Sequence, residues 1–93
     1  MSNPRVIKKY PNRRLYDTEE SRYITLADIK DLVMNKVDFE VIDKKSGEDI
    51  TRTILLQVIS EQEQHGDAIM TEDFLAQIIR AYGSVVPDFM ARY

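Results

Sequence analysis

The spacing of apolar residues changes from strand-like to helix-like along this chain. Val37, Phe39 and Val41 alternate with charged residues, which is the period of a half-buried strand. Residues 54–59 and 74–82 instead place apolar side chains at the spacing of one helix face. The 93 residues allow one domain at most. We therefore expect a small single domain of the α+β class.

Three short strands are predicted before the first helix. Residues 6–10 favour β structure, Pro11 and Asn12 form a turn signal, and residues 13–17 run back as the second strand of a hairpin. Residues 22–24 favour a third strand. Aromatic residues near strand ends often pack beneath a helix, so at least two of the tyrosines are expected in the core. These tyrosines are Tyr10, Tyr16 and Tyr23.

Thr25 is the predicted N-cap of the first helix, because Asp28 follows it at the spacing of a capping box. This helix should end near residues 35–36. A second β-hairpin is predicted next, with its first strand at 37–41 and its return strand beginning at Ile50.

Two to three helices complete the predicted fold. Thr51 or Thr53 caps the first of them, and Thr71 caps the second, which Gly83 should end. Pro87 suits the first turn of a further helix. The expected organisation is thus a basic N-terminal hairpin at 5–24, an α+β core at 25–83 and an apolar C-terminal helix at 84–93.

The C-terminal segment is unusually apolar, and it stops in the middle of its pattern, which suggests that a longer chain was cut here. A helix of this kind either packs on its own core or pairs with another copy, and we favour a homo-oligomer, a dimer or higher. The candidate dimerisation residues are Val85, Val86, Phe89, Met90 and Tyr93.

Positive charge is concentrated at the front of the chain. Residues 1–14 carry five Lys or Arg and no acid, whereas the other 8 Lys and Arg share residues 15–93 with all 16 Asp and Glu. The net charge of −3 argues against a nucleic-acid partner, but this local excess argues for one. The five cations are Arg5, Lys8, Lys9, Arg13 and Arg14.

Two interpretations of this basic hairpin stand about equal on charge alone. In one, the cations cover apolar surface and pair with the acidic body. In the other, they bind phosphates of double-stranded DNA, whose major groove admits a two-stranded ribbon, and one arginine grips a guanine edge. RNA is less favoured, since no RNP-like or GXXG motif is present. The candidate DNA-binding residues are Lys8, Lys9, Tyr10, Asn12, Arg13 and Arg14.

Catalytic chemistry finds little support in the sequence. There is no Cys, and the single histidine, His65, lies in a polar helix end without the partners that a metal site or a general base needs. The three glycines are isolated, so no phosphate-binding loop is present. We expect no enzyme, metal or cofactor. No apolar run reaches the ~20 residues of a membrane span, and the lack of Cys fits a cytoplasmic protein.

The chain carries five segments in this order: KKYPNRRLYD (8–17), SRYITLAD (21–28), FEVID (39–43), GEDITR (47–52) and ILLQ (54–57). They closely resemble the bacterial polyhydroxyalkanoate (polyhydroxybutyrate) accumulation regulators, over roughly residues 5–83. The resemblance implies the N-terminal DNA-binding domain of a transcriptional repressor of polyhydroxyalkanoate synthesis and granule-associated proteins. Such repressors leave DNA when they bind the storage polymer or a granule, so the polymer is the implied inducer. The alternative is a protein-interaction or granule-surface module that docks through the apolar C-terminal helix.

Overall fold

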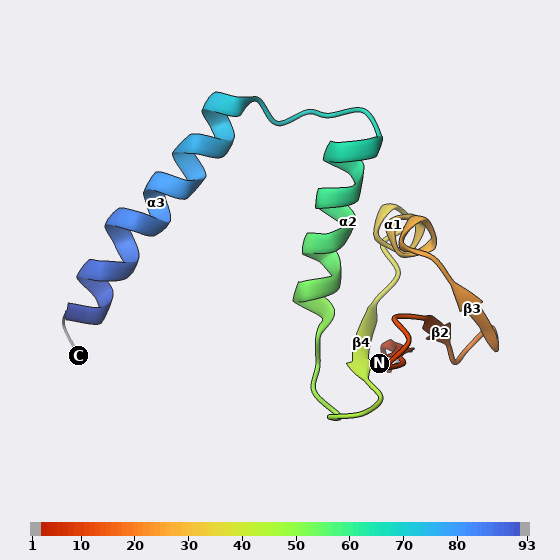
Figure 1. Cartoon of the computed structure of the whole chain (residues 1–93). Coiled ribbons are helices and arrows are strands. Elements are labelled where there is room, and N and C mark those ends of the chain that lie inside the picture. The colour runs from red at the N-terminus through yellow and green to blue at the C-terminus, as the bar shows by residue number, and fades with distance from the viewer. Residues whose placement is uncertain (1–2, 92–93) are drawn as a thin grey trace. The chain divides into compact units, whose positions relative to one another are not determined.

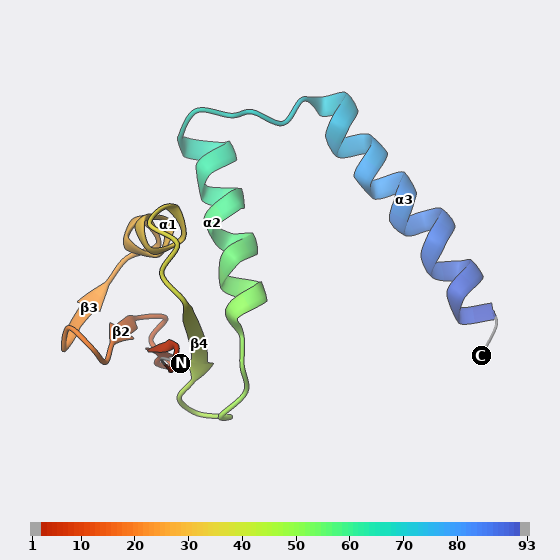
Figure 2. The same ribbon diagram turned by 180° about the vertical axis from the view of Figure 1, so that it is seen from behind.

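A four-stranded sheet and three helices make up the computed structural model, which describes the backbone of residues 3–91 and the side chains of residues 3–83. The chain divides into two compact units, at residues 1–61 and 62–93. Figure 1 and Figure 2 show the elements from two sides. They are β1 (Arg5–Lys9), β2 (Leu15–Asp17), β3 (Arg22–Ile24), α1 (Leu26–Met34), β4 (Phe39–Asp43), α2 (Thr51–His65) and α3 (Glu72–Ala91).

The strands lie in the order β3-β2-β1-β4. β2 is antiparallel to both β1 and β3, whereas β4 runs parallel to β1, with Val41 opposite Ile7. The α+β class is confirmed, with strands first and helices after them. The predicted return strand of the second hairpin is wrong in extent, because this segment forms only a single bridge between Ile42 and Asp49. Pairing β4 with β1 instead buries Val41 beside Ile7, which an isolated hairpin would not do.

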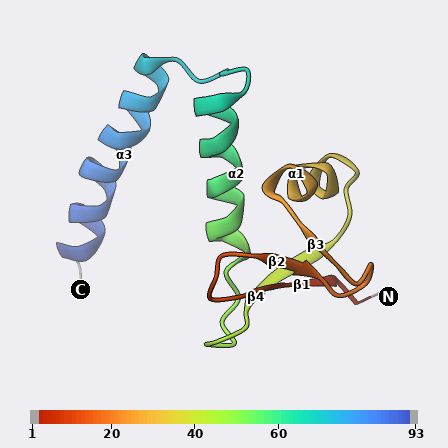
Figure 3. The same cartoon turned by 45° about the vertical axis from the view of Figure 1, so that its right-hand side comes forward.

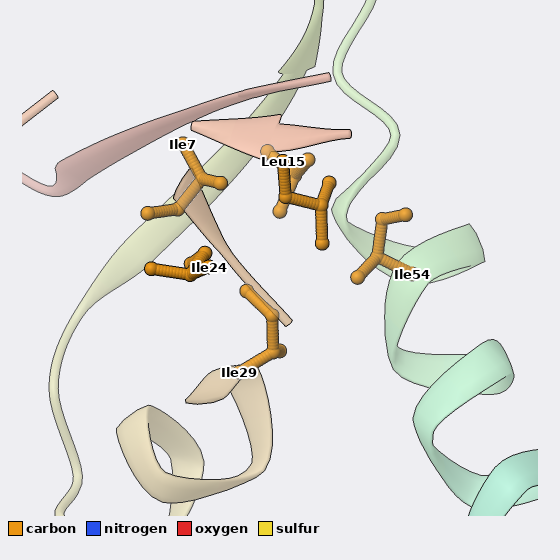
Figure 4. Close-up of a cluster of buried hydrophobic side chains, with 6 residues drawn as sticks. Ile7, Leu15, Ile24, Ile29 and Ile54 are labelled. Carbon is orange, nitrogen blue, oxygen red and sulfur yellow. The ribbon is translucent and has the colours of Figure 1, made fainter. Parts of the chain in front are cut away.

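The core lies between one face of the sheet and the helices α1 and α2. Figure 3 shows both helices on the same side of the sheet, and Figure 4 shows the apolar side chains between them. Ile29 of α1 and Ile54 of α2 are buried against the strands. The core residues are Ile7, Leu15, Ile24, Ile29, Val41 and Ile54.

The three tyrosines lie on the other face of the sheet, so the expectation that two of them are core is wrong. Side chains alternate between the two faces of a strand. Leu15 and Asp17 are buried on the face of β2 that meets the helices, so Tyr16 between them points to the opposite face. Tyr23 likewise precedes the buried Ile24 and is 46% exposed. Apolar isoleucine and leucine side chains fill the helix side, which leaves the tyrosines on the face opposite α1 and α2.

Most predicted helix ends are confirmed. Thr25 and Asp28 form the capping box of α1, and Thr71 Oγ1 accepts a hydrogen bond from the Phe74 N–H at the start of α3. The capping acceptor of α2 is Asp49 rather than Thr51 or Thr53: its Oδ1 accepts from the Thr51 N–H at 2.9 Å.

The C-terminal helix is longer than predicted. α3 runs without a break from Glu72 to Ala91, so Gly83 does not end it and no new helix begins at Pro87. The apolar spacing continues across Gly83, which favours one continuous helix over two. The predicted dimerisation residues, Val85, Val86, Phe89, Met90 and Tyr93, lie outside the residues whose side chains the structure describes.

Candidate nucleic-acid interface

The turn between β1 and β2 presents two arginines side by side. The Arg13 N–H donates to the Tyr10 carbonyl at 2.9 Å, and the Tyr10 N–H donates to the Arg14 carbonyl at 2.9 Å. Pro11 presets the first corner, and Asn12 Oδ1 accepts from the Arg14 N–H at 3.2 Å. Arg13 has φ +67°, so the loop is a three-residue hairpin turn with a left-handed third residue. Asn12 therefore shapes the turn, and both arginine side chains are exposed.

Arg14 is held over an aromatic ring. Its guanidinium carbon lies 3.8 Å from the centroid of the Tyr23 ring, the geometry of a cation–π contact. Tyr16 packs edge-on to Tyr23 at 5.2 Å, and Tyr10 packs edge-on to Tyr16 at 6.4 Å. Because the rings cover one another and Arg14 covers Tyr23, the tyrosine cluster (Tyr10, Tyr16 and Tyr23) supports Arg14 and is poorly suited to stacking bases.

The predicted DNA-binding lysines point to opposite faces of the sheet. Lys8 pairs with Tyr16 and lies on the tyrosine side, whereas Lys9 pairs with Leu15 on the helix side. Lys9, Arg13 and Arg14 together line a pocket of about 820 Å³. Of the six predicted residues, Lys8 and Tyr10 thus lie on the tyrosine face and Lys9 on the helix face, while Asn12, Arg13 and Arg14 belong to the turn that follows β1.

One of the five N-terminal cations is neutralised by acids. Arg5 forms ion pairs with Asp17 at 3.2 Å, with Glu19, and with Glu20 at 3.9 Å. In contrast, the structure shows no ion pair for the remaining four with any side chain that it describes. Four positive charges, on Lys8, Lys9, Arg13 and Arg14, therefore have no ion-pair partner among the described side chains.

Two further lysines lie at the same end of the sheet. Because β1 and β4 are parallel, both end beside the hairpin turn, and the Lys44 N–H donates to the Lys9 carbonyl at 2.8 Å. Lys45 follows it. The sequence places these lysines in a polar turn, and only the parallel pairing, which local patterns do not specify, brings them to the basic hairpin. One part of this arrangement can be predicted from the sequence. Side chains alternate between the two faces of a strand, and this alternation places Tyr16 and Tyr23 on the same face as Lys8.

Shifted pKa values occur outside the hairpin turn. Hydrogen bonds from Thr51 hold the pKa of Asp49 below its ordinary value of 3.8, and the hydrogen bond to Glu20 raises the pKa of Arg22. Among the described residues, no group of three or more His, Cys, Asp or Glu could hold a metal ion. Within the same part of the chain, no helix is long and apolar enough to cross a membrane.

Comparison with known proteins identifies the class. The family model of the PHB/PHA accumulation regulator DNA-binding domain matches residues 6–66. An uncharacterized protein in the phbA 5′ region of Thiocystis violacea is 55% identical over the whole chain, and an uncharacterized protein of Allochromatium vinosum is 56% identical. The chain spans 67% and 61% of their respective lengths. No solved structure matches it.

These matches place the chain among DNA-binding regulator domains, which are not a class of enzymes. It belongs to the family of PHB/PHA accumulation regulator DNA-binding domains. The resemblance predicted from the sequence is confirmed.

Proposed function

We propose that this domain binds double-stranded DNA in a sequence-specific way through the end of the sheet that carries residues 10–14. The observation that carries the proposal is the absence of ion pairs at Lys8, Lys9, Arg13 and Arg14 within the described chain, beside an Arg5 that has three acidic partners. Uncompensated cations bind phosphates and release the counterions of DNA. Membership of a DNA-binding family supports the same partner.

The two arginines are suited to different contacts. Arg13, Lys8 and Lys9 supply charge to the phosphate backbone. Arg14 lies over the Tyr23 ring, and a guanidinium held by such a contact suits the bidentate contact to guanine O6 and N7. Tyr10 completes the aromatic support, and Asn12 fixes the turn.

In its biological context, the domain acts in a cytoplasmic transcriptional repressor of polyhydroxyalkanoate synthesis and of granule-associated proteins. The storage polymer or a granule would act as the inducer that removes it from DNA. The resemblance to the family and the match of residues 6–66 support this role. One relative is named for its place in a phbA 5′ region, which supports the same role.

Self-association is part of the proposal. α3 exposes large apolar side chains, among them Phe74 at 49%, Ile79 at 70% and Tyr82 at 60%. Exposed apolar residues at helical spacing suit pairing with a second copy. The same surface also favours the alternative function, docking on another protein or a granule, in which the basic hairpin plays no part.

A salt titration tests DNA binding. Operator DNA is the best-binding duplex recovered from a random pool, and affinity is measured by fluorescence anisotropy. The three phosphate contacts from Lys8, Lys9 and Arg13 predict a slope of log K against log salt of about −2.7 per copy. Arg13→Ala and Arg14→Ala should each weaken binding with little change in thermal stability, because both side chains are exposed.

Lys36→Gln is the matched control, since this exposed lysine precedes β4 and lies at the other end of the sheet. It should bind as the unmodified domain does. A flat salt dependence, or binding unaffected by Lys8→Glu with Lys9→Glu, would favour the docking alternative over DNA binding.

A further inference from the structure

Two turns lie at the same end of the sheet. The parallel register joins Arg5 to Phe39 and continues to Lys9 and Asp43, so β1 and β4 end side by side. The hairpin turn, residues 10–14, follows β1, and a second turn, residues 43–47, follows β4. The Lys44 N–H of the second turn donates to the carbonyl of Lys9, the last residue of β1 before the hairpin turn, at 2.8 Å.

The second turn is internally fixed. The Gly47 N–H donates to the Asp43 carbonyl at 2.7 Å, and the Asp43 N–H donates to the Glu48 carbonyl at 2.9 Å. Gly47 has φ +78°, a conformation that glycine adopts without strain. Lys44 and Lys45 are therefore carried on a hydrogen-bonded turn and not on a loose loop.

Both lysines are exposed and have no ion pair with a side chain that the structure describes. The acids of the turn are engaged locally. Asp43 Oδ1 accepts from the Lys45 N–H at 2.9 Å, and Asp49 Oδ1 accepts from the Thr51 hydroxyl at 2.6 Å. Glu48 is an exposed carboxylate at the turn's exit. With the four cations of the hairpin, six positive charges meet three carboxylates at this end of the sheet.

We propose that Lys44 and Lys45 form a second arm of the DNA interface and bind phosphates of the same duplex as the hairpin turn. The inference rests on the proposed function and extends its contact surface to a segment distant in sequence. A lysine ammonium is a point charge without a planar fork, so it suits a phosphate better than the two-atom contact that reads a base edge. The second arm therefore adds affinity for all DNA sequences equally and adds no discrimination.

The test is the double variant Lys44→Gln, Lys45→Gln. Each lost phosphate contact should make the salt slope about 0.9 less negative, so the double variant should lose about 1.8. By the same relation, affinity near physiological salt should fall about fivefold per lysine and about thirtyfold for the pair. The loss should be equal on operator DNA and on a mixed-sequence duplex. Lys36→Gln is again the control and should change neither.

The outcomes separate the two proposals. If Arg13→Ala weakens binding while the double variant keeps the original slope and affinity, the second arm is wrong and the DNA-binding function stands. If the unmodified domain shows no salt-dependent binding, the proposed function itself is wrong. A loss confined to operator DNA would also contradict the inference, because it would indicate base contacts. An unchanged thermal midpoint of the double variant confirms that the substitutions leave the fold intact. Each of the two single variants should show half of the change in salt slope.

Discussion

Arg13 occupies a backbone conformation that suits glycine. Its φ of +67° costs a residue with a Cβ atom about 1 kcal/mol relative to glycine, and glycine is the usual residue at this place in such a hairpin. Folding alone would therefore favour glycine here. Arg13→Gly should raise the free energy of unfolding by about 1 kcal/mol and lower DNA affinity about fivefold near physiological salt. Urea denaturation and anisotropy measure the two effects.

Lys36 provides a matched control for this trade-off. It has φ +56° and closes the end of α1, where the Val37 N–H donates to the Leu32 carbonyl at 2.9 Å. Lys36→Gly should bring the same gain in stability without weakening DNA binding. Equal affinities of the two glycine variants would show that the Arg13 side chain has no role in binding.

The contact between Arg14 and Tyr23 is expected to govern sequence discrimination. Tyr23→Leu removes the ring that orients the guanidinium, so the ratio of affinities for operator and mixed-sequence DNA should fall, while the salt slope is kept. Tyr23→Phe keeps the ring and should keep the ratio. If Leu and Phe behave alike at this position, the ring does not position Arg14. Tighter binding of single-stranded DNA than of the duplex would instead indicate base stacking on the tyrosine cluster.

At the scale of elements, Asp49 and Thr51 connect β4 to α2. Asp49 accepts hydrogen bonds from the Thr51 N–H and hydroxyl, and the hydroxyl oxygen accepts from the Val41 N–H at 2.8 Å. The pKa of Asp49 is lowered below 3.8 by these bonds. Because the pKa is lower in the folded state, the carboxylate stabilises the fold at any pH above its pKa in the unfolded state. This contribution is lost as the pH falls through its pKa in the folded state.

Asp49→Ala should therefore lower the urea midpoint at neutral pH, and the difference from the unmodified protein should shrink as pH falls below 3.8. Glu48→Ala removes the neighbouring exposed carboxylate, which caps nothing, and should leave the midpoint nearly unchanged. A difference for Asp49→Ala that is constant across this pH range would show that its charge does not matter.

Local patterns predicted the elements better than their pairing. The capping box at Thr25 and the end of α1 are properties of neighbouring residues, so the sequence was sufficient for both. The alternation of Val37, Phe39 and Val41 predicts a strand, but it is the same for a parallel or an antiparallel neighbour. The parallel partner of β4 was missed for this reason, and with it the position of Lys44 and Lys45.

In the basic hairpin, too, some features are predicted by neighbouring residues and others depend on the fold. Its charge excess and turn were evident from residues 8–14, whereas the ion pairs of Arg5 depend on Asp17 and on Glu19, which only folding brings together. Two of the tyrosines are predicted in the core because aromatic residues near strand ends often pack on a neighbouring helix. The core was filled instead by Ile7, Leu15 and the other aliphatic residues.

At the scale of the whole molecule, the buried apolar cluster of the described residues lies before residue 55, and Val58 of α2 packs against it. The buried cluster extends from Ile7 to Ile54, and the family model ends at residue 66. Burial of an apolar cluster is the main source of stability in a chain without disulfides. A fragment of residues 1–66 should therefore unfold cooperatively, with its thermal midpoint close to that of the full chain after the contribution of self-association is removed.

Self-association of the full chain is then expected to depend on α3. Ile79 is 70% exposed, so its replacement by a charge costs little in the fold of one copy but disrupts an apolar contact between two. Ile79→Glu should shift sedimentation equilibrium from dimer to monomer and roughly halve the salt slope of DNA binding, since one set of cations then meets the duplex. Gln77→Lys, an exposed polar position on the same helix, should leave both unchanged. The fragment 1–66 should behave as the Ile79→Glu variant does. If the full chain is monomeric, or if the variant dimerises as well as the unmodified protein, the apolar face of α3 does not form a contact between two copies.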